Sequence, residues 1–234
     1  MADGGGYTTA LIVGAGTGLS ASLARAFARS GMQVTVASRS PQRLAPLVAE
    51  LGVSALACDA TDPSQVRALF QAMDAGAGAP DVVVYNAGAR TSGPLVGLAP
   101  EDVERTLLGN AYGGFLVAQA AVQRMLPRGR GAVLFTGASA SVKGYAQSAP
   151  FAMGKFALRG LAQSMARELA PAGIHVAHFV IDGAIRNPGR SEPADRPDSM
   201  LDPAAIADAY LAVLRQPRSA WTYELELRPW VETF

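Results

Sequence analysis

The sequence has little of what marks a secreted or metal-binding protein. Its 234 residues include one cysteine, Cys58, and two histidines. A single cysteine excludes an intramolecular disulfide framework and is typical of a reducing compartment. His175 and His178 are three residues apart on an expected strand, so they point to opposite faces and lack converging ligand partners. We therefore expect no metal site.

Charge is also scarce, and long apolar runs are absent. Charged residues make up 17% of the chain, the net charge is +1, and there is no basic run or acidic tail. This pattern does not favour binding to nucleic acid or to an anionic membrane surface. No apolar run reaches the roughly 18–20 residues of a membrane span. The start, "MADGGGYTT", lacks the basic-then-apolar pattern of a secretory signal. A cytoplasmic protein without a membrane partner is expected.

Short apolar runs alternate with helical patterns along the whole chain, and half of the residues are hydrophobic. Strict alternation of strand and helix predicts an α/β fold, a single doubly wound Rossmann-like domain over residues 1–234. Its seven-stranded, mainly parallel sheet would carry helices on both faces. Residues 184–201, rich in Pro, Arg, Asp and Ser, predict a mobile loop on the substrate side. The expected strands are 9–14, 32–39, 53–60, 80–88, 131–139, 174–183 and 220–229; the expected helices are 20–31, one from Pro41, 61–76, 99–126, 149–172 and 202–216.

A glycine-rich turn follows the first expected strand. A backbone without side chains there lets a pyrophosphate approach the N–H groups and the positive end of the next helix. The spacing G-x-x-x-G-x-G fits with serine in its third glycine position, whereas G-x-G-x-x-G fails because leucine occupies its last place. A tight turn without a ligand is the alternative. Ser20 is small enough for the close packing of strand and helix that the third glycine usually serves. The expected cofactor-binding residues of this turn are Gly14, Gly16, Thr17, Gly18 and Leu19.

The end of the second strand indicates which dinucleotide would bind. Ser38, Arg39 and Ser40 stand where an NAD site usually has an acidic residue that accepts from the ribose 2′-hydroxyl. An arginine suits a 2′-phosphate. The sequence therefore favours NADP(H) over NAD(H), against the alternative of one more solvated surface arginine.

Six short motifs occur in order along the sequence. They are the glycine turn, "CDAT" at 58–61, "NAG" at 86–88, and then Asn110, Ser139 and Lys155. Together they resemble the short-chain dehydrogenase/reductase family over essentially the whole chain. Members of that family are mostly NAD(P)-dependent oxidoreductases with this fold and are commonly dimers or tetramers.

The resemblance implies a role for each matching residue. Asn110 would support a water relay behind the active-site lysine, and Ser139 would hydrogen-bond the substrate oxygen. Lys155 would bind the nicotinamide ribose and lower the pKa of a catalytic tyrosine. The remaining matches would lie along the cofactor, from the adenine to the nicotinamide: Asp59, Ala60, Asn86, Ala87, Gly88 and Gly183.

One departure from the family pattern is severe, because Phe151 stands four residues before Lys155, where the family has its catalytic tyrosine. Phenylalanine has no hydroxyl to donate a proton. Tyr145 is one candidate substitute, and an ordinary surface aromatic is its alternative. Ser139 and Lys155 are another, stabilising an oxyanion while water supplies the proton. Val13 and Ser20 are mild departures, and Asp182 and Asn187 are two further ones.

These observations predict an NADP(H)-dependent oxidoreductase that interconverts a carbonyl and an alcohol on an unidentified small substrate. The alternatives are a dinucleotide-binding protein without redox turnover, with a sensor or structural role, and a non-redox reaction in the same pocket. Helices at 101–126 and 149–172 are apolar over more than one face, which predicts a homodimer or homotetramer. Three loop arginines, if not simply solvated, would attract an anionic substrate: Arg186, Arg190 and Arg196.

Overall fold

The computed structural model describes residues 6–233. Residues 1–5 lie outside the described part. They begin the segment "MADGGGYTT", for which no secretory signal is expected. Within the described part, no helix is both long and apolar enough to cross a membrane.

The fold is a single sheet of seven parallel strands in the order β3-β2-β1-β4-β5-β6-β7. β1 lies inside the sheet. β2 and then β3 lie on one side of it, and β4 lies on its other side, so the direction in which strands are added reverses between β3 and β4. Nucleotides bind at such a reversal of strand order, outside the carboxyl ends of the strands. The predicted fold class is confirmed. The strands are β1 (Thr9–Val13), β2 (Gln33–Ser38), β3 (Ser54–Ala57), β4 (Val82–Tyr85), β5 (Gly131–Thr136), β6 (Ile174–Ile181) and β7 (Glu224–Leu227).

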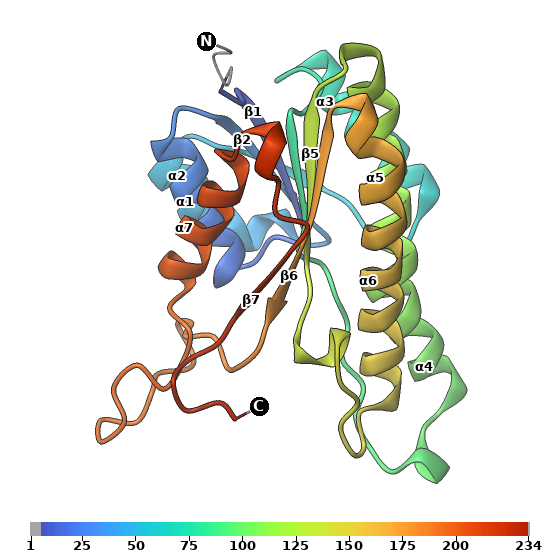
Figure 1. Cartoon of the computed structure of the whole chain (residues 1–234), viewed down its shortest axis with the longest axis vertical. Coiled ribbons are helices and arrows are strands. Elements are labelled where there is room, and N and C mark those ends of the chain that lie inside the picture. The colour runs from blue at the N-terminus through green and yellow to red at the C-terminus, as the bar shows by residue number, and fades with distance from the viewer. Residues whose placement is uncertain (1–5, 234) are drawn as a thin grey trace.

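Helices cover both faces of the sheet (Figure 1). One layer contains α1 (Leu19–Arg29), α2 (Ala45–Leu51) and α7 (Pro203–Leu214). The other contains α3 (Pro63–Ala75), α5 (Gly113–Met125) and α6 (Ala149–Leu169). Alternate residues of β1 accordingly belong to two separate cores, Ala10 and Ile12 to one and Leu11 and Val13 to the other. This double burial explains why the central strands read as continuous apolar runs.

The expected long helix at 99–126 contains an irregular turn. It begins as α4 (Pro100–Leu107), widens into a π-helical turn over Leu108–Tyr112, and continues as α5. Gly113 lies where the turn meets the sheet, and a Cβ there would come within 2.5 Å of the Tyr85 hydroxyl. Such turns are frequent at functional sites because they displace one side chain from the helical register. Here the turn contains Asn110.

Other boundaries differ from expectation at strand ends and at one helix start. The strands β3, β4 and β7 are shorter than predicted, since the expected ranges included turn residues next to each strand, such as Asn86–Gly88 after β4. The helix expected from Pro41 begins as a 3-10 turn, Pro41–Leu44, before α2.

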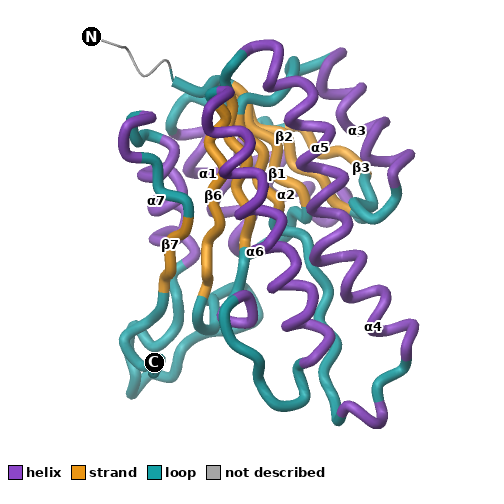
Figure 2. Tube along the Cα trace, turned by 45° about the vertical axis from the view of Figure 1, so that its right-hand side comes forward, coloured by secondary structure: helices purple, strands orange, loops and turns teal. Residues whose placement is uncertain are grey.

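Loops that connect the carboxyl ends of the strands to the following helices gather at one end of the molecule. In Figure 2 they form the lower edge, where α4 extends beyond the sheet on one side and the C-terminus lies on the other. The candidate site is at this end.

Candidate functional site

The glycine turn packs directly against the turn that follows β4. Gly14 has a positive φ of 85°, and the backbone N–H groups of Gly14 and Ala15 both donate to the Ala37 carbonyl at 2.9 Å. A Cβ on Gly14 would lie only 2.2 Å from the backbone nitrogen of Ala87. Glycine is therefore required by both conformation and space.

Ser20, in the place of the third glycine, ties the same two turns together. Its hydroxyl donates to the Gly14 carbonyl at 3.3 Å and accepts from the Asn86 side-chain amide at 2.7 Å. The serine is buried. It thus adds hydrogen bonds to the close packing that the sequence predicted for it.

A cleft of about 710 Å³ opens along the carboxyl ends of β1 to β4. Its size is suitable for a small-molecule or cofactor site. Gly18 and Leu19 begin α1 next to the cleft without lining it. Ten of the residues predicted to bind the cofactor do line it: Gly14, Gly16, Thr17, Ser38, Arg39, Asp59, Ala60, Asn86, Ala87 and Gly88.

Positive charge is concentrated where β2 enters the cleft. Arg39 and Arg43 both line it, together with Ser38 and Ser40. Neither arginine makes an ion pair or side-chain hydrogen bond within residues 6–233, so both guanidinium groups remain available to an anion. Arg43 was missed from the sequence, although its place in the first turn after Pro41 was a usable signal.

The opposite wall carries charges that sequence reasoning also missed. Glu101, Glu104 and Arg105 of α4 line the cleft. Acidic residues in a first helical turn ordinarily stabilise the helix start, so the sequence alone did not indicate that they line a cleft.

Lys155 lies buried behind the Asn86–Gly88 turn. Its Nζ donates to the Thr136 carbonyl at 2.9 Å and would lie 3.8 Å from a Cβ on Gly88. Burial lowers the pKa of Lys155 to about 8. The ammonium is thus held next to a turn that lines the cleft, while Lys155 itself does not line it.

Asn110 is fixed beside this lysine by the π-helical turn. Its amide nitrogen donates to the carbonyls of Ala89 at 2.6 Å and Thr106 at 2.8 Å. Its buried Oδ1 has no hydrogen-bond partner in the described part of the protein. A Cβ on Gly88 would lie 2.9 Å from that oxygen. An unpartnered acceptor next to the cleft suits a site that is completed by water or by a bound molecule.

Two cations lie near the ring of Phe151. The Arg90 guanidinium carbon is 5.5 Å from the ring centroid, and Lys155 Nζ is 5.8 Å from it. Both distances are within the range of cation–π attraction.

The loop from β5 to α6 carries the other two candidate catalytic residues. Ser139 is half-buried, and its hydroxyl makes no hydrogen bond within the described residues. Tyr145 is 47% exposed, with Lys143 Nζ at 5.9 Å from its ring centroid. Ser139, Phe151 and Tyr145 do not line the cleft.

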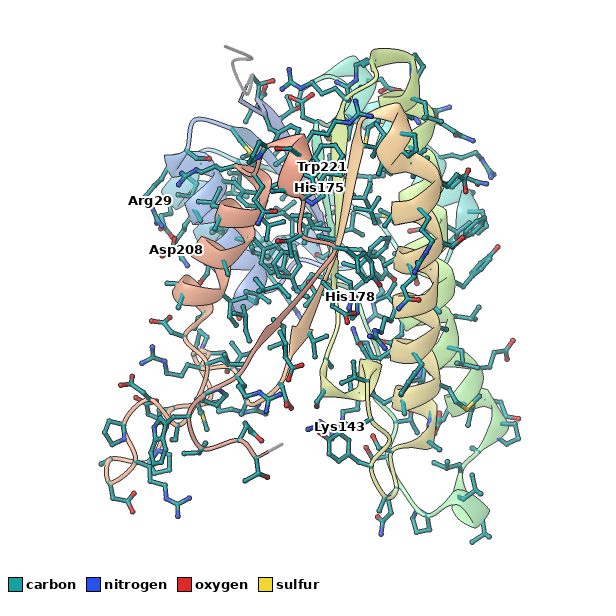
Figure 3. The ribbon with its side chains drawn as sticks, viewed as in Figure 1. Arg29, Lys143, His175, His178, Asp208 and Trp221 are labelled. Atoms are coloured by element: carbon teal, nitrogen blue, oxygen red, sulfur yellow. The ribbon has the colours of Figure 1, made fainter. Side chains whose placement is uncertain are left out.

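Asp182, which departs from the family pattern, is part of an ion-pair cluster near Gly183. Its buried carboxylate lies 3.4 Å from Lys143 Nζ and 3.5 Å from an Arg228 nitrogen. Figure 3 shows Lys143 at the end of the molecule where the strand-to-helix loops gather. A carboxylate in this buried position is stabilised by its two cationic partners.

The histidines have partners within the fold. His175 stacks on Trp221 at 4.6 Å between ring centroids, and its Nε2 lies 2.9 Å from the Thr222 carbonyl oxygen. His178 Nδ1 lies 3.0 Å from a Glu224 carboxylate oxygen, and burial lowers the pKa of His178 to about 4. The two rings occupy separate places along β6 (Figure 3). Among residues 6–233, no group of three or more His, Cys, Asp or Glu side chains is placed to hold a metal ion.

Comparison with known sequences identifies the family. The family described as short chain dehydrogenase matches residues 8–190. This stretch holds the glycine turn, Asn110, Phe151 and Lys155. The protein belongs to the short-chain dehydrogenase family.

Relatives agree with that membership. The protein is 31% identical over 172 residues to a D-threitol dehydrogenase of Mycolicibacterium smegmatis, covering 71% of this chain and 66% of that protein, slightly less than two thirds. A solved short-chain dehydrogenase from Rhodopseudomonas palustris is 37% identical, with a TM-score of 0.82 over 95% of this chain and 99% of that one. An alcohol dehydrogenase from Thermococcus sibiricus, solved with 5-hydroxy-NADP, is 26% identical, with a TM-score of 0.84 over 97% and 98%.

The loop arginines of this short-chain dehydrogenase differ in their surroundings. Arg186 pairs with Asp202 at 2.7 Å and with Glu192 at 3.6 Å, so its charge is already compensated. Arg190 and Arg196 are exposed. Arg186 is therefore a poor candidate for attracting an anionic substrate.

Proposed function

We propose that the protein is an NADP(H)-dependent oxidoreductase that interconverts a carbonyl and an alcohol on a small molecule. The observation that carries this proposal is the cleft at the carboxyl ends of β1 to β4, with Arg39 and Arg43 at the end of β2. A dinucleotide fits it, because the glycine turn leaves backbone N–H groups open to a pyrophosphate and the arginines match a 2′-phosphate. The alcohol dehydrogenase solved with an NADP derivative supports the same assignment.

The bound nicotinamide would supply or accept the hydride. The protein's own task is then to stabilise the negative charge that develops on the substrate oxygen. Phe151 cannot donate to that oxygen, so we assign the task to the Ser139 hydroxyl and the Lys155 ammonium, with water supplying the proton. Asn110, held beside Lys155, would support that water through its unpartnered oxygen.

Tyr145 stays a weaker candidate for the proton donor. Its ring is half exposed, and its cationic neighbour is Lys143 rather than Lys155. A dinucleotide-binding protein without turnover is the alternative function. The dehydrogenases among the relatives favour the enzyme.

The cofactor assignment predicts a preference that can be measured directly. In a fluorescence titration, NADPH should bind at least about tenfold more tightly than NADH, because charge-assisted hydrogen bonds contribute roughly 1.5–3 kcal/mol. Arg39→Asp should remove or reverse this preference. Arg29→Asp, at the exposed end of α1 away from the cleft, makes the same change of charge and should leave the preference intact. Binding of neither cofactor would refute the proposed function.

We also propose that the protein self-associates through α4, α5 and α6. Apolar side chains on this surface are strongly exposed, and patches of this kind on soluble proteins usually mark interfaces. Sedimentation velocity at micromolar concentration should show a dimer or tetramer. A single monomeric species would contradict the proposal. The exposed side chains are Leu95, Val96, Tyr112, Phe115, Met153 and Phe156.

A further inference from the structure

Arg90 is an exposed cation beside the ring that stands in place of the family's tyrosine, and among the described residues it has no carboxylate partner. Its guanidinium lies over the Phe151 ring, and within residues 6–233 it makes no ion pair or side-chain hydrogen bond. Lys155, on the same ring, hydrogen-bonds a neutral carbonyl only. Two positive charges, the buried Lys155 and the exposed Arg90, therefore lie near the Phe151 ring, and no side chain of the described residues neutralises them.

Three other cations are compensated by carboxylates, unlike Arg90. Lys143 and Arg228 share the buried carboxylate of Asp182. Arg186 is paired with Glu192 and Asp202.

The backbone on both sides of Arg90 is held in place. The Ala89 carbonyl accepts from the Asn110 amide at 2.6 Å. The Thr91 hydroxyl lies 2.8 Å from that of Thr106, which is fully buried. Arg90 thus projects from an anchored segment immediately after the Asn86–Gly88 turn, unlike an arginine on a free loop. Anchoring lowers the entropic cost of ordering a ligand-binding side chain.

We propose that Arg90 binds a carboxylate group of the substrate, so that the protein acts on oxo acids and the corresponding hydroxy acids. This inference rests on the proposed function. A guanidinium presents paired N–H donors that match a carboxylate in a bidentate way. The Phe151 ring supports the guanidinium from one side and offers no hydroxyl to compete with the ligand. Since Arg90 and Lys155 contact the same ring, one small molecule can place its carboxylate on Arg90 and its reacting oxygen toward Lys155.

The activity test compares acids with their esters. Pyruvate, acetoacetate and levulinate, each with its methyl ester, serve as substrates with NADPH. The wild type should show a kcat/KM at least about tenfold higher for one or more acids than for the matching ester. Arg90→Met should lower kcat/KM for that acid by at least about tenfold, chiefly through KM, and leave the ester within about threefold. Arg90→Lys should give an intermediate loss.

Matched controls separate a local effect from a general one. Arg190→Met removes an exposed arginine of the substrate-side loop. It should change kcat/KM neither for the acid nor for the matching ester. The inference would be overturned if the wild type had equal kcat/KM for acid and ester, or if Arg90→Met lowered kcat/KM equally for both. Either result would leave the proposed oxidoreductase function standing.

A binding measurement keeps the inference testable without turnover. Calorimetric titration of the protein–NADP⁺ complex with the three oxo acids should give heat of binding for at least one, lost in Arg90→Met and retained in Arg190→Met. The affinity of Arg90→Met for NADPH, measured by fluorescence titration, should equal that of the wild type. This measurement distinguishes loss of the substrate site from loss of the cofactor site. Absence of oxo-acid binding to a complex that binds NADP⁺ normally would refute the carboxylate site alone.

Discussion

Replacing Phe151 by tyrosine is expected to raise the rate of NADPH-dependent carbonyl reduction by about 100-fold. A positioned proton donor contributes 10²–10⁴-fold in general acid catalysis. The ring at this position already lies beside Lys155, whose Nζ is 5.8 Å from the centroid. The ammonium would lower the pKa of the new phenol and so favour proton transfer near neutral pH. Steady-state kcat, measured with one reducible carbonyl compound at saturating NADPH, is the readout.

The control is a hydroxyl added to the same helix outside the site. Ala157 lies on α6 and is exposed. Ala157→Ser should leave kcat unchanged. If Phe151→Tyr binds NADPH normally and gains nothing, the pocket does not hold a carbonyl next to residue 151, and the dinucleotide-binding alternative becomes the better explanation.

The fold was predictable because its signals are local and repeated. Each central strand is an apolar run buried on both faces, so β1, β4 and β5 were evident without knowledge of their neighbours. The glycine turn was equally predictable from the sequence, since a positive φ at Gly14 favours that residue type. The strands β3, β4 and β7 were overestimated because the turn residues next to each strand continue its pattern, and the sequence does not show where pairing with a neighbour ends.

The details of the site depend on residues that are distant in sequence. Lys143 and Asp182 are 39 positions apart, and no pattern in either segment indicates their ion pair. The hydrogen bond from Asn86 to Ser20 spans 66 positions. Arg90 was overlooked for a different reason, because a single arginine after a turn is ordinary. Only its position over Phe151, and the absence of a carboxylate beside it among the described residues, set it apart.

Replacing Gly14 by alanine is expected to destabilise the protein by roughly 3 kcal/mol. A left-handed backbone costs a residue with a Cβ about 1–2 kcal/mol, and overpacking adds about 1–3 kcal/mol. The Cβ would lie 2.2 Å from the Ala87 nitrogen and 2.3 Å from its Cα, both backbone atoms that cannot turn aside. For a protein of this length, the thermal midpoint should fall by roughly 6–12 °C. Calorimetry without cofactor measures this change.

Gly16 provides the matched control in the same turn. A Cβ there meets nothing within 4 Å, and Gly16 is not among the glycines with positive φ. Gly16→Ala should therefore keep the wild-type midpoint within about 2 °C, since surface substitutions usually change stability by less than about 0.5 kcal/mol. Because Gly16 lines the cleft, the same variant should still weaken NADPH binding if the dinucleotide approaches the turn closely. Equal midpoints for the two variants would mean that the turns after β1 and β4 are not packed as described.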